Sequence, residues 1–253
     1  SDEGPDEVRA TGDDVVYLLR SANAYYPGAR LTAEDAMATW AGLRPLLKPE
    51  ATRDPSAVSR EHRVVEGAQG LVSIVGGKLT TYRVMARQVV DIIAWRLHRL
   101  DGRPLARRPP THREPLPGGE ARDLDVVVRE VEREGLARLV AEHLVGTYGT
   151  EAIAVARLAR SSDDLRQPMV PGHPALRAEL VHAIRREMAM TLCDLLIRRT
   201  HVFYETPGHA VAEAPALLDL AAAELGWAAP RKAQELAAYL QEVERATAFR
   251  RES

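Results

Sequence analysis

The sequence has only one cysteine among its 253 residues. Cys193 cannot form an internal disulfide, and no second thiol exists to build a CxxC metal or redox site. His182, His201 and His209 lack the i, i+4 spacing of paired ligands on one helix, so we expect no metal site. This cysteine usage fits a reducing compartment, and we expect a cytoplasmic protein.

Long apolar runs are absent too. No run approaches the roughly 18 to 20 apolar residues that a membrane-spanning helix needs. No signal-peptide pattern precedes the first segment that we expect to fold. We therefore expect a chain that does not cross a membrane, while a peripheral position on the inner face of the cytoplasmic membrane stays open.

Aromatic residues are scarce, and neither sign of charge dominates. Phenylalanine, tryptophan and tyrosine make up 5% of the residues, which gives little material for a surface that stacks on bases. The formal net charge is −2 and the pI is about 6.5, so the chain lacks the basic footprint of a nucleic-acid-binding protein. Nucleic acid is not among the expected partners.

The residues that are present predict a globular chain in two parts. Hydrophobic residues make up 45% and charged residues 28%, which is enough to bury a core in each part. Residues 103–119 hold five prolines and four arginines and are interpreted as a linker. A segment of this kind is more often a solvated tether than a contact with lipid headgroups. Residues 1–102 before it mix strand and helix patterns, whereas residues 120–253 after it are patterned as helices.

The first part contains capping motifs, two β runs joined by a short glycine-containing loop, and one long apolar helical stripe. The capping boxes at Thr11 and Thr32 predict a helix that ends near Tyr26 and a short helix through Trp40. Two β runs, 59–65 and 71–75, predict a hairpin, and the stripe predicts a helix from about Thr81 to Leu100.

The second part is predicted to be a helix bundle. The later helices are expected from about Leu176 to Met190, Thr191 to Thr200, Ala214 to Leu225 and Arg231 to Ala248. One group of charges resembles an acid/base constellation but is interpreted as structural ion pairs: Glu187, Asp194, Arg198 and Arg199. The whole chain is therefore expected to be mostly helical.

Residues 71–83 have the pattern of a strand, a glycine turn and a helix start. Gly76 and Gly77 permit backbone angles that other residues avoid, and Thr80 or Thr81 is expected to cap the helix. Such a junction leaves N–H groups unpaired at the positive end of a helix dipole, where an anion or an electron-rich ring edge can bind, and Lys78 adds a charge. On spacing alone, a plain tight turn is the commoner interpretation.

The full string Gly76-Gly77-Lys78-Leu79-Thr80-Thr81-Tyr82-Arg83 closely resembles the C-terminal flavin-contacting segment of FAD-dependent glycerol-3-phosphate dehydrogenases. The resemblance extends over almost the whole chain, from Asp13 through Thr200. It implies that residues 1–102 are the C-terminal part of an α/β FAD-binding and substrate domain, and that residues 120–253 are an all-α C-terminal domain. It also implies that Gly76, Gly77, Lys78, Leu79 and Thr80 bind FAD.

Two arginines acquire a role from the resemblance. From its apolar neighbours, Arg44 is either a solvent-facing residue on an edge strand or a residue held inward to meet an anion. Arg60 is either a solvated charge at a strand end or a ligand. The family segments that residues 42–46 and Arg60 resemble carry substrate-facing arginines, so Arg44, Arg60 and Lys78 are the expected substrate-binding residues.

The G-x-G-x-x-G fingerprint of dinucleotide-binding βαβ units is missing. The family has it in an N-terminal part, together with a histidine thought to act as the base. We therefore expect this chain to correspond to the C-terminal part of such an enzyme, to contain no catalytic residue itself, and to need the N-terminal FAD-binding part as a partner.

The implied reaction is the oxidation of sn-glycerol 3-phosphate to dihydroxyacetone phosphate, with electrons passing through FAD to a quinone. A homodimer and a membrane surface are further partners that the resemblance leaves open. A glycerol-3-phosphate oxidase, which passes electrons to oxygen, shares these motifs, and peroxide production distinguishes the two. A non-catalytic helical docking or membrane-surface module is the third hypothesis, supported by the missing fingerprint and opposed by the retained Gly76–Arg83 string.

Overall fold

A computed structural model describes residue 4 and residues 8–43, 61–105 and 109–251 of the chain. The chain divides into two compact units. The helical unit consists of residues 1–41 and 116–253, and the hairpin unit consists of residues 42–115. This division differs from the boundary expected at residue 102, because the first 41 residues belong with the C-terminal helices. As predicted, the described chain is mostly helical.

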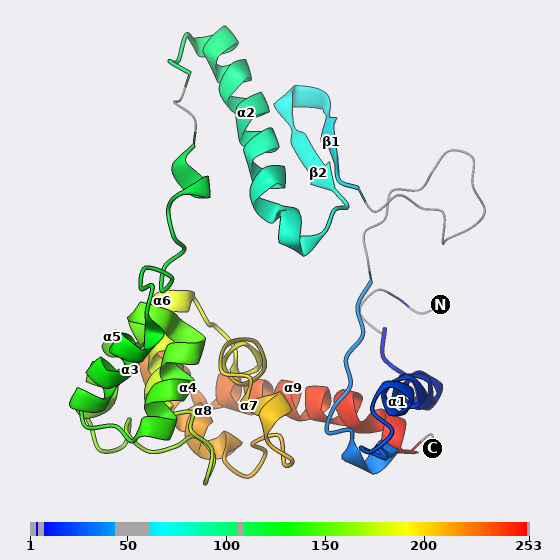
Figure 1. Cartoon of the computed structure of the whole chain (residues 1–253), viewed down its shortest axis with the longest axis vertical. Coiled ribbons are helices and arrows are strands. Elements are labelled where there is room, and N and C mark those ends of the chain that lie inside the picture. The colour runs from blue at the N-terminus through cyan, green and yellow to red at the C-terminus, as the bar shows by residue number, and fades with distance from the viewer. Residues whose placement is uncertain (1–3, 5–7, 44–60, 106–108, 252–253) are drawn as a thin grey trace. The chain divides into compact units, whose positions relative to one another are not determined.

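The hairpin unit is built from two short strands and one long helix (Figure 1). Strands β1 (Arg63–Glu66) and β2 (Val72–Val75) are antiparallel, with Arg63 opposite Val75 and Glu66 opposite Val72. This confirms the predicted hairpin, which is the only sheet in the part of the chain that the structure describes. Among the described residues of the unit, the α/β character is therefore limited to this pair of strands and helix α2.

Helix α2 (Tyr82–Asp101) follows the hairpin and contacts β2. Its stripe of Met85, Val89 and Ile92 is half-buried. The helix ends at Gly102, which adopts the left-handed conformation (φ 65°) and donates its N–H to the carbonyl of His98. The predicted helix and its glycine stop are thus confirmed.

The helical unit begins with helix α1 (Gly12–Tyr25), which has the predicted capping box. The Asp14 N–H donates to Thr11 Oγ1 at 3.3 Å, and the Thr11 N–H donates to Asp14 Oδ2 at 2.9 Å. No helix among the described residues is long and apolar enough to span a membrane.

The short helix expected from Thr32 through Trp40 is wrong in its length. The capping box at Thr32 forms, but it opens only one 3₁₀ turn, Ala33–Asp35. The following residues bond instead to the far end of the chain: the Thr39 N–H donates to the Ala246 carbonyl at 2.9 Å, and Arg250 donates to the Ala36 carbonyl at 2.9 Å. These contacts accompany a segment, 36–41, that forms no helix.

Among the described residues, seven further α-helices make up most of the helical unit. They are α3 (Leu124–Arg133), α4 (Arg138–Tyr148), α5 (Ala152–Arg160), α6 (Arg177–Glu187), α7 (Val202–Glu205), α8 (Ala214–Leu225) and α9 (Ala229–Thr247). The helix predicted over 191–200 is present, but its residues Asp194–Arg199 form a π-helix rather than an α-helix. The expected ion pairs are present in this region: Arg198 Nη1 lies 2.8 Å from Asp194 Oδ1, and Arg199 Nε lies 3.9 Å from Glu187 Oε2.

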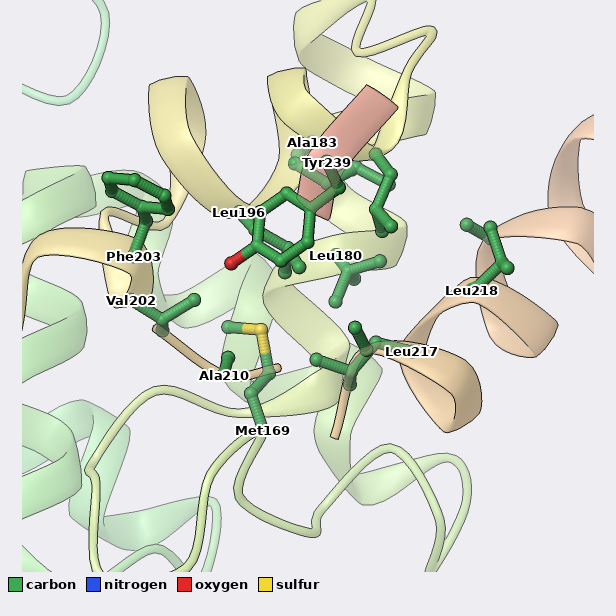
Figure 2. Close-up of a cluster of buried hydrophobic side chains, with 14 of the residues drawn as sticks. Met169, Leu180, Ala183, Leu196, Val202, Phe203, Ala210, Leu217, Leu218 and Tyr239 are labelled. Carbon is green, nitrogen blue, oxygen red and sulfur yellow. The ribbon is translucent and has the colours of Figure 1, made fainter. Parts of the chain in front are cut away.

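Two apolar cores share helix α6. Val131, Leu144 and Val155 are buried in the core of α3, α4 and α5, to which α6 contributes Ala178. Leu180, on the same helix, belongs to the second core, where Tyr239 is surrounded by apolar side chains from several elements (Figure 2). Helix α6 therefore joins the two halves of the unit, so changes within it should affect both cores.

Met188 offers a direct test of backbone strain at the end of α6. It adopts the left-handed conformation (φ 58°, ψ 32°), and its side chain is 83% exposed. Glycine adopts this conformation without strain, so Met188→Gly should raise the free energy of unfolding by about 0.5–1 kcal/mol. Urea unfolding of the two proteins measures the difference. A destabilised variant would show that the Met188 side chain makes a needed contact.

Candidate functional site

The candidate site is the glycine turn between β2 and α2. Gly76 and Gly77 adopt φ values of 76° and 91°, a region that favours glycine. Lys78 is extended, and a 3₁₀ turn, Leu79–Thr81, leads directly into α2. The strand, glycine turn and helix start predicted from the sequence are confirmed in this order.

Both glycines are also required by their surroundings. A Cβ on Gly76 would lie 2.9 Å from the Glu61 carbonyl oxygen. A Cβ on Gly77 would lie 2.7 Å from Met85 Sδ and 2.9 Å from His62 Cβ. Real Cβ atoms do not approach neighbours so closely, so the turn runs against the hairpin on one side and α2 on the other. Its path is fixed by packing as well as by its own dihedral angles.

The helix start does not have the side-chain cap that the sequence suggested. Neither Thr80 nor Thr81 accepts a capping hydrogen bond from a helical N–H. Instead, Thr81 Oγ1 donates back to the Lys78 carbonyl at 2.8 Å, and the Thr81 N–H donates to the same oxygen at 2.9 Å. The correction is that Thr81 holds the turn rather than capping the helix.

This arrangement leaves N–H groups available. Among the described residues, no acceptor bonds the N–H groups of Leu79 and Thr80. Leu79 is 88% exposed, and Lys78 is exposed beside it. Two free donors and an ammonium group at the positive end of a helix can bind an anion or an electron-rich ring edge.

The structure brings some predicted site residues together and leaves others aside. Gly76 through Thr80 form one continuous turn, whereas Arg44 and Arg60 lie outside the described residues. His62 Nε2 lies 2.5 Å from Gln88 Oε1 on α2. The contribution of Met85 was not predicted from the sequence. Its i, i+4 spacing from Thr81 was the available signal, since Thr81 Oγ1 lies 3.5 Å from Met85 Sδ.

The described residues contain no group of three or more histidine, cysteine or acidic side chains able to hold a metal ion.

Comparisons with known proteins find relatives in the family that the string Gly76–Arg83 resembles. Residues 109–232 match the family described as the C-terminal domain of alpha-glycerophosphate oxidase. A glycerol-3-phosphate dehydrogenase of Synechocystis sp. is 32% identical over 228 residues, which is 88% of this chain and 40% of that protein. The mitochondrial glycerol-3-phosphate dehydrogenase of Mus musculus is 34% identical over 230 residues, 88% of this chain and 31% of that protein.

A solved structure is similar over nearly the whole chain. It is the glycerol-3-phosphate dehydrogenase from Bacillus halodurans complexed with FAD, with a TM-score of 0.78 and 28% identity, covering 98% of this chain and 47% of that one. The chain thus spans less than half the length of these relatives. The matches show that the chain belongs to the glycerol-3-phosphate dehydrogenase family, whose C-terminal region it matches.

Proposed function

We propose that the chain forms the C-terminal part of an FAD-dependent glycerol-3-phosphate dehydrogenase and supplies the electrostatic half of its active site. The observation that carries the proposal is the turn at residues 76–80, which is held by both neighbouring elements and has two N–H groups without acceptors among the described residues. A tight turn with a purely structural role does not need an ammonium group and free donors on its exposed side.

The turn fits a flavin. Its two glycines carry no side chain, so a planar ring can approach the backbone closely. Bound FAD would take a hydride from C2 of sn-glycerol 3-phosphate, yielding dihydroxyacetone phosphate, and pass the electrons on to a quinone. The N–H groups of Leu79 and Thr80, at the positive helix end, would stabilise the negative charge of the reduced ring.

Basic side chains would hold the substrate. Arg44 and Arg60 are proposed to bind the phosphate or the developing carbonyl oxygen of glycerol 3-phosphate through charge-assisted hydrogen bonds, for which the planar guanidinium group is suited. Lys78 is proposed to contribute to the substrate or the flavin. The catalytic base would come from the N-terminal FAD-binding part of the enzyme, which is the proposed partner of this chain.

Replacing Arg44 tests the substrate assignment. In an enzyme assembled with the N-terminal part, Arg44→Ala should lower turnover roughly a hundredfold or more, because one charged donor is lost from the transition state. Steady-state kinetics with glycerol 3-phosphate measure the effect. Arg129→Ala, at an exposed position on α3, is the matched control and should keep full turnover. Equal kinetics for the two variants would refute the role of Arg44.

The electron acceptor, location and assembly are proposals too. A quinone acceptor requires the enzyme to reach a membrane, so we propose a cytoplasmic protein that lies on the inner face of the cytoplasmic membrane, with a homodimer as a further assembly to test. A glycerol-3-phosphate oxidase is the second candidate, because the matched family model is described by an alpha-glycerophosphate oxidase. Hydrogen peroxide formed stoichiometrically in air would favour the oxidase.

The first experiment is a visible absorption titration with FAD, followed by anaerobic addition of glycerol 3-phosphate. The chain is titrated alone and together with the N-terminal part of a related dehydrogenase. A bound-flavin spectrum that bleaches only in the mixture supports the proposal. Bleaching by the chain alone would show that no essential half is supplied by a partner. Absence of flavin binding in both samples would favour a helical docking module.

A further inference from the structure

Thr81 makes two hydrogen bonds to a single acceptor at the glycine turn. Its hydroxyl and its own N–H both donate to the carbonyl oxygen of Lys78, at 2.8 and 2.9 Å. The N–H bond alone is the ordinary bond of a 3₁₀ turn. The additional hydroxyl bond saturates this oxygen, so the peptide between Lys78 and Leu79 is held in one orientation.

That orientation decides where the next donor points. In a trans peptide the C=O and N–H groups point in opposite directions. Because the Lys78 carbonyl points toward Thr81, the Leu79 N–H points away from it, and this N–H bonds no acceptor among the described residues. Thr81 therefore aims a backbone donor without contacting whatever that donor binds.

The other side of the turn is fixed by packing. Gly77 lies between the side chains of Met85 and His62, closely enough that a Cβ would clash with both. Met85 also contacts the Thr81 hydroxyl at 3.5 Å. Packing thus holds Gly77 in place, and the hydrogen bonds of Thr81 hold the carbonyl of Lys78. The peptide between Lys78 and Leu79 therefore cannot rotate freely.

We propose that Thr81 is a positioning residue for the flavin, acting by holding the Lys78 carbonyl so that the Leu79 N–H meets the ring where negative charge develops. The inference rests on the proposed function, since it assumes that the turn contacts FAD. A donor aimed in advance stabilises charge without reorganising. Loss of the Thr81 hydroxyl should therefore weaken the binding of reduced flavin more than that of oxidised flavin.

Three variants separate this role from a general effect on folding. Thr81→Val keeps the shape and loses the hydroxyl, whereas Thr81→Ser keeps the hydroxyl. Thr111→Val is the matched control, at an exposed threonine in another 3₁₀ turn of the hairpin unit. In the chain without flavin, the carbonyl ¹³C resonance of Lys78 should move upfield in Thr81→Val and stay in place in the other two.

The flavin readouts use the FAD-bound preparation from the titration. Thr81→Val should weaken the binding of reduced flavin about tenfold relative to oxidised flavin, as expected when a hydrogen bond to a charged group is impaired. A tenfold change equals a fall of about 30 mV in the two-electron reduction potential. Thr81→Ser and Thr111→Val should keep the potential of the unsubstituted protein.

The outcomes distinguish the positioning role of Thr81 from the proposed function of the chain. A shifted Lys78 resonance with a lowered potential in Thr81→Val alone supports the positioning role. An unchanged potential in a protein that binds FAD refutes the role of Thr81 and leaves the proposed function intact. If the unsubstituted protein binds no FAD with or without its partner, the proposed function fails and this inference fails with it. An unshifted Lys78 resonance refutes the inference on structural grounds alone.

Discussion

Replacing Gly149 with alanine is expected to lower the free energy of unfolding of the helical unit by about 4 kcal/mol. Gly149 follows helix α4 with φ 57° and ψ −128°, a conformation reserved for glycine. A Cβ there would lie 1.9 Å from the carbonyl oxygen of Gly118. Strained backbone costs about 1–3 kcal/mol, and overpacking adds about 1–3 kcal/mol.

The contact cannot relax easily, because Gly118 is tightly placed as well. It is buried with φ 86°, and its own Cβ would lie 2.5 Å from the Tyr148 carbonyl oxygen. The Gly118 carbonyl also accepts the N–H of Thr150 at 2.9 Å. The end of the linker and the end of α4 thus pack closely at two glycines. Movement of either segment would break the hydrogen bond between the Thr150 N–H and the Gly118 carbonyl.

Thermal unfolding measures the effect, with an expected fall in the midpoint of roughly 10 °C. Gly146→Ala is the matched control, because Gly146 lies inside α4 and a Cβ there meets nothing within 4 Å. Alanine is the better helix former, so this variant should gain about 0.5–1 kcal/mol. Equal stability of the two variants would contradict the packing argument.

Local signals in the sequence were sufficient for many elements. Helix α8 has the predicted bounds, Ala214–Leu225, because Pro215 favours a first turn and Gly226 ends the helix in the left-handed conformation. The hairpin followed from two β runs joined by a short glycine-containing loop, and α2 followed from the apolar stripe. These features depend on residues close in sequence, and a single sequence contains that information.

The errors come from distant contacts and from ambiguous periodicity. The helix expected through Trp40 is shorter because Thr39 bonds Ala246, 207 residues away. The π-helix at 194–199 includes an extra residue per turn, since the Thr200 N–H and hydroxyl both donate to the Leu195 carbonyl at 3.1 and 2.8 Å. The buried pair Leu195 and Leu196 fits an α-helix equally well, so hydrophobic patterning does not separate the two.

In the candidate site, too, local sequence predicted some features, whereas features that depend on packing were missed. Gly76, Gly77 and Lys78 were recognised because their types and order suffice to define the turn. The role of Thr81 was mistaken because a threonine at a helix start bonds forward or backward according to where the neighbouring carbonyl points. That direction is set by the packing of Gly77 against Met85, a contact that residue order alone does not reveal.

Replacing Glu179 is the second change with a large expected effect. Its carboxylate is fully buried on α6, between the two cores. It accepts hydrogen bonds from His143 Nε2 at 3.0 Å, the Tyr148 hydroxyl at 3.1 Å and the Leu176 N–H at 2.6 Å. Removing one partner of a buried, bonded charge typically costs about 3–5 kcal/mol, so Glu179→Ala should destabilise the helical unit by this amount.

The histidine partner makes this contribution depend on pH. Burial alone would lower the pKa of His143, but the hydrogen bond and charge of Glu179 outweigh it, and the pKa is raised above its usual 6.5. Glu205 contributes in the same direction, and the His173 ring, 6.0 Å away, also faces His143. Protonated His143 therefore stabilises the folded state below pH 6.5, and this stabilisation is lost as the pH rises through the raised folded value.

Urea unfolding at several pH values tests both the destabilisation by Glu179→Ala and the pH dependence of the His143 contribution. The difference in unfolding free energy between the unsubstituted protein and His143→Gln should be largest at pH 6 and should shrink toward pH 8. Glu142→Gln, on the exposed side of α4, is the matched control and should change stability by less than about 0.5 kcal/mol. A difference for His143→Gln that stays constant from pH 6 to 8 would show that folding does not raise the pKa of His143.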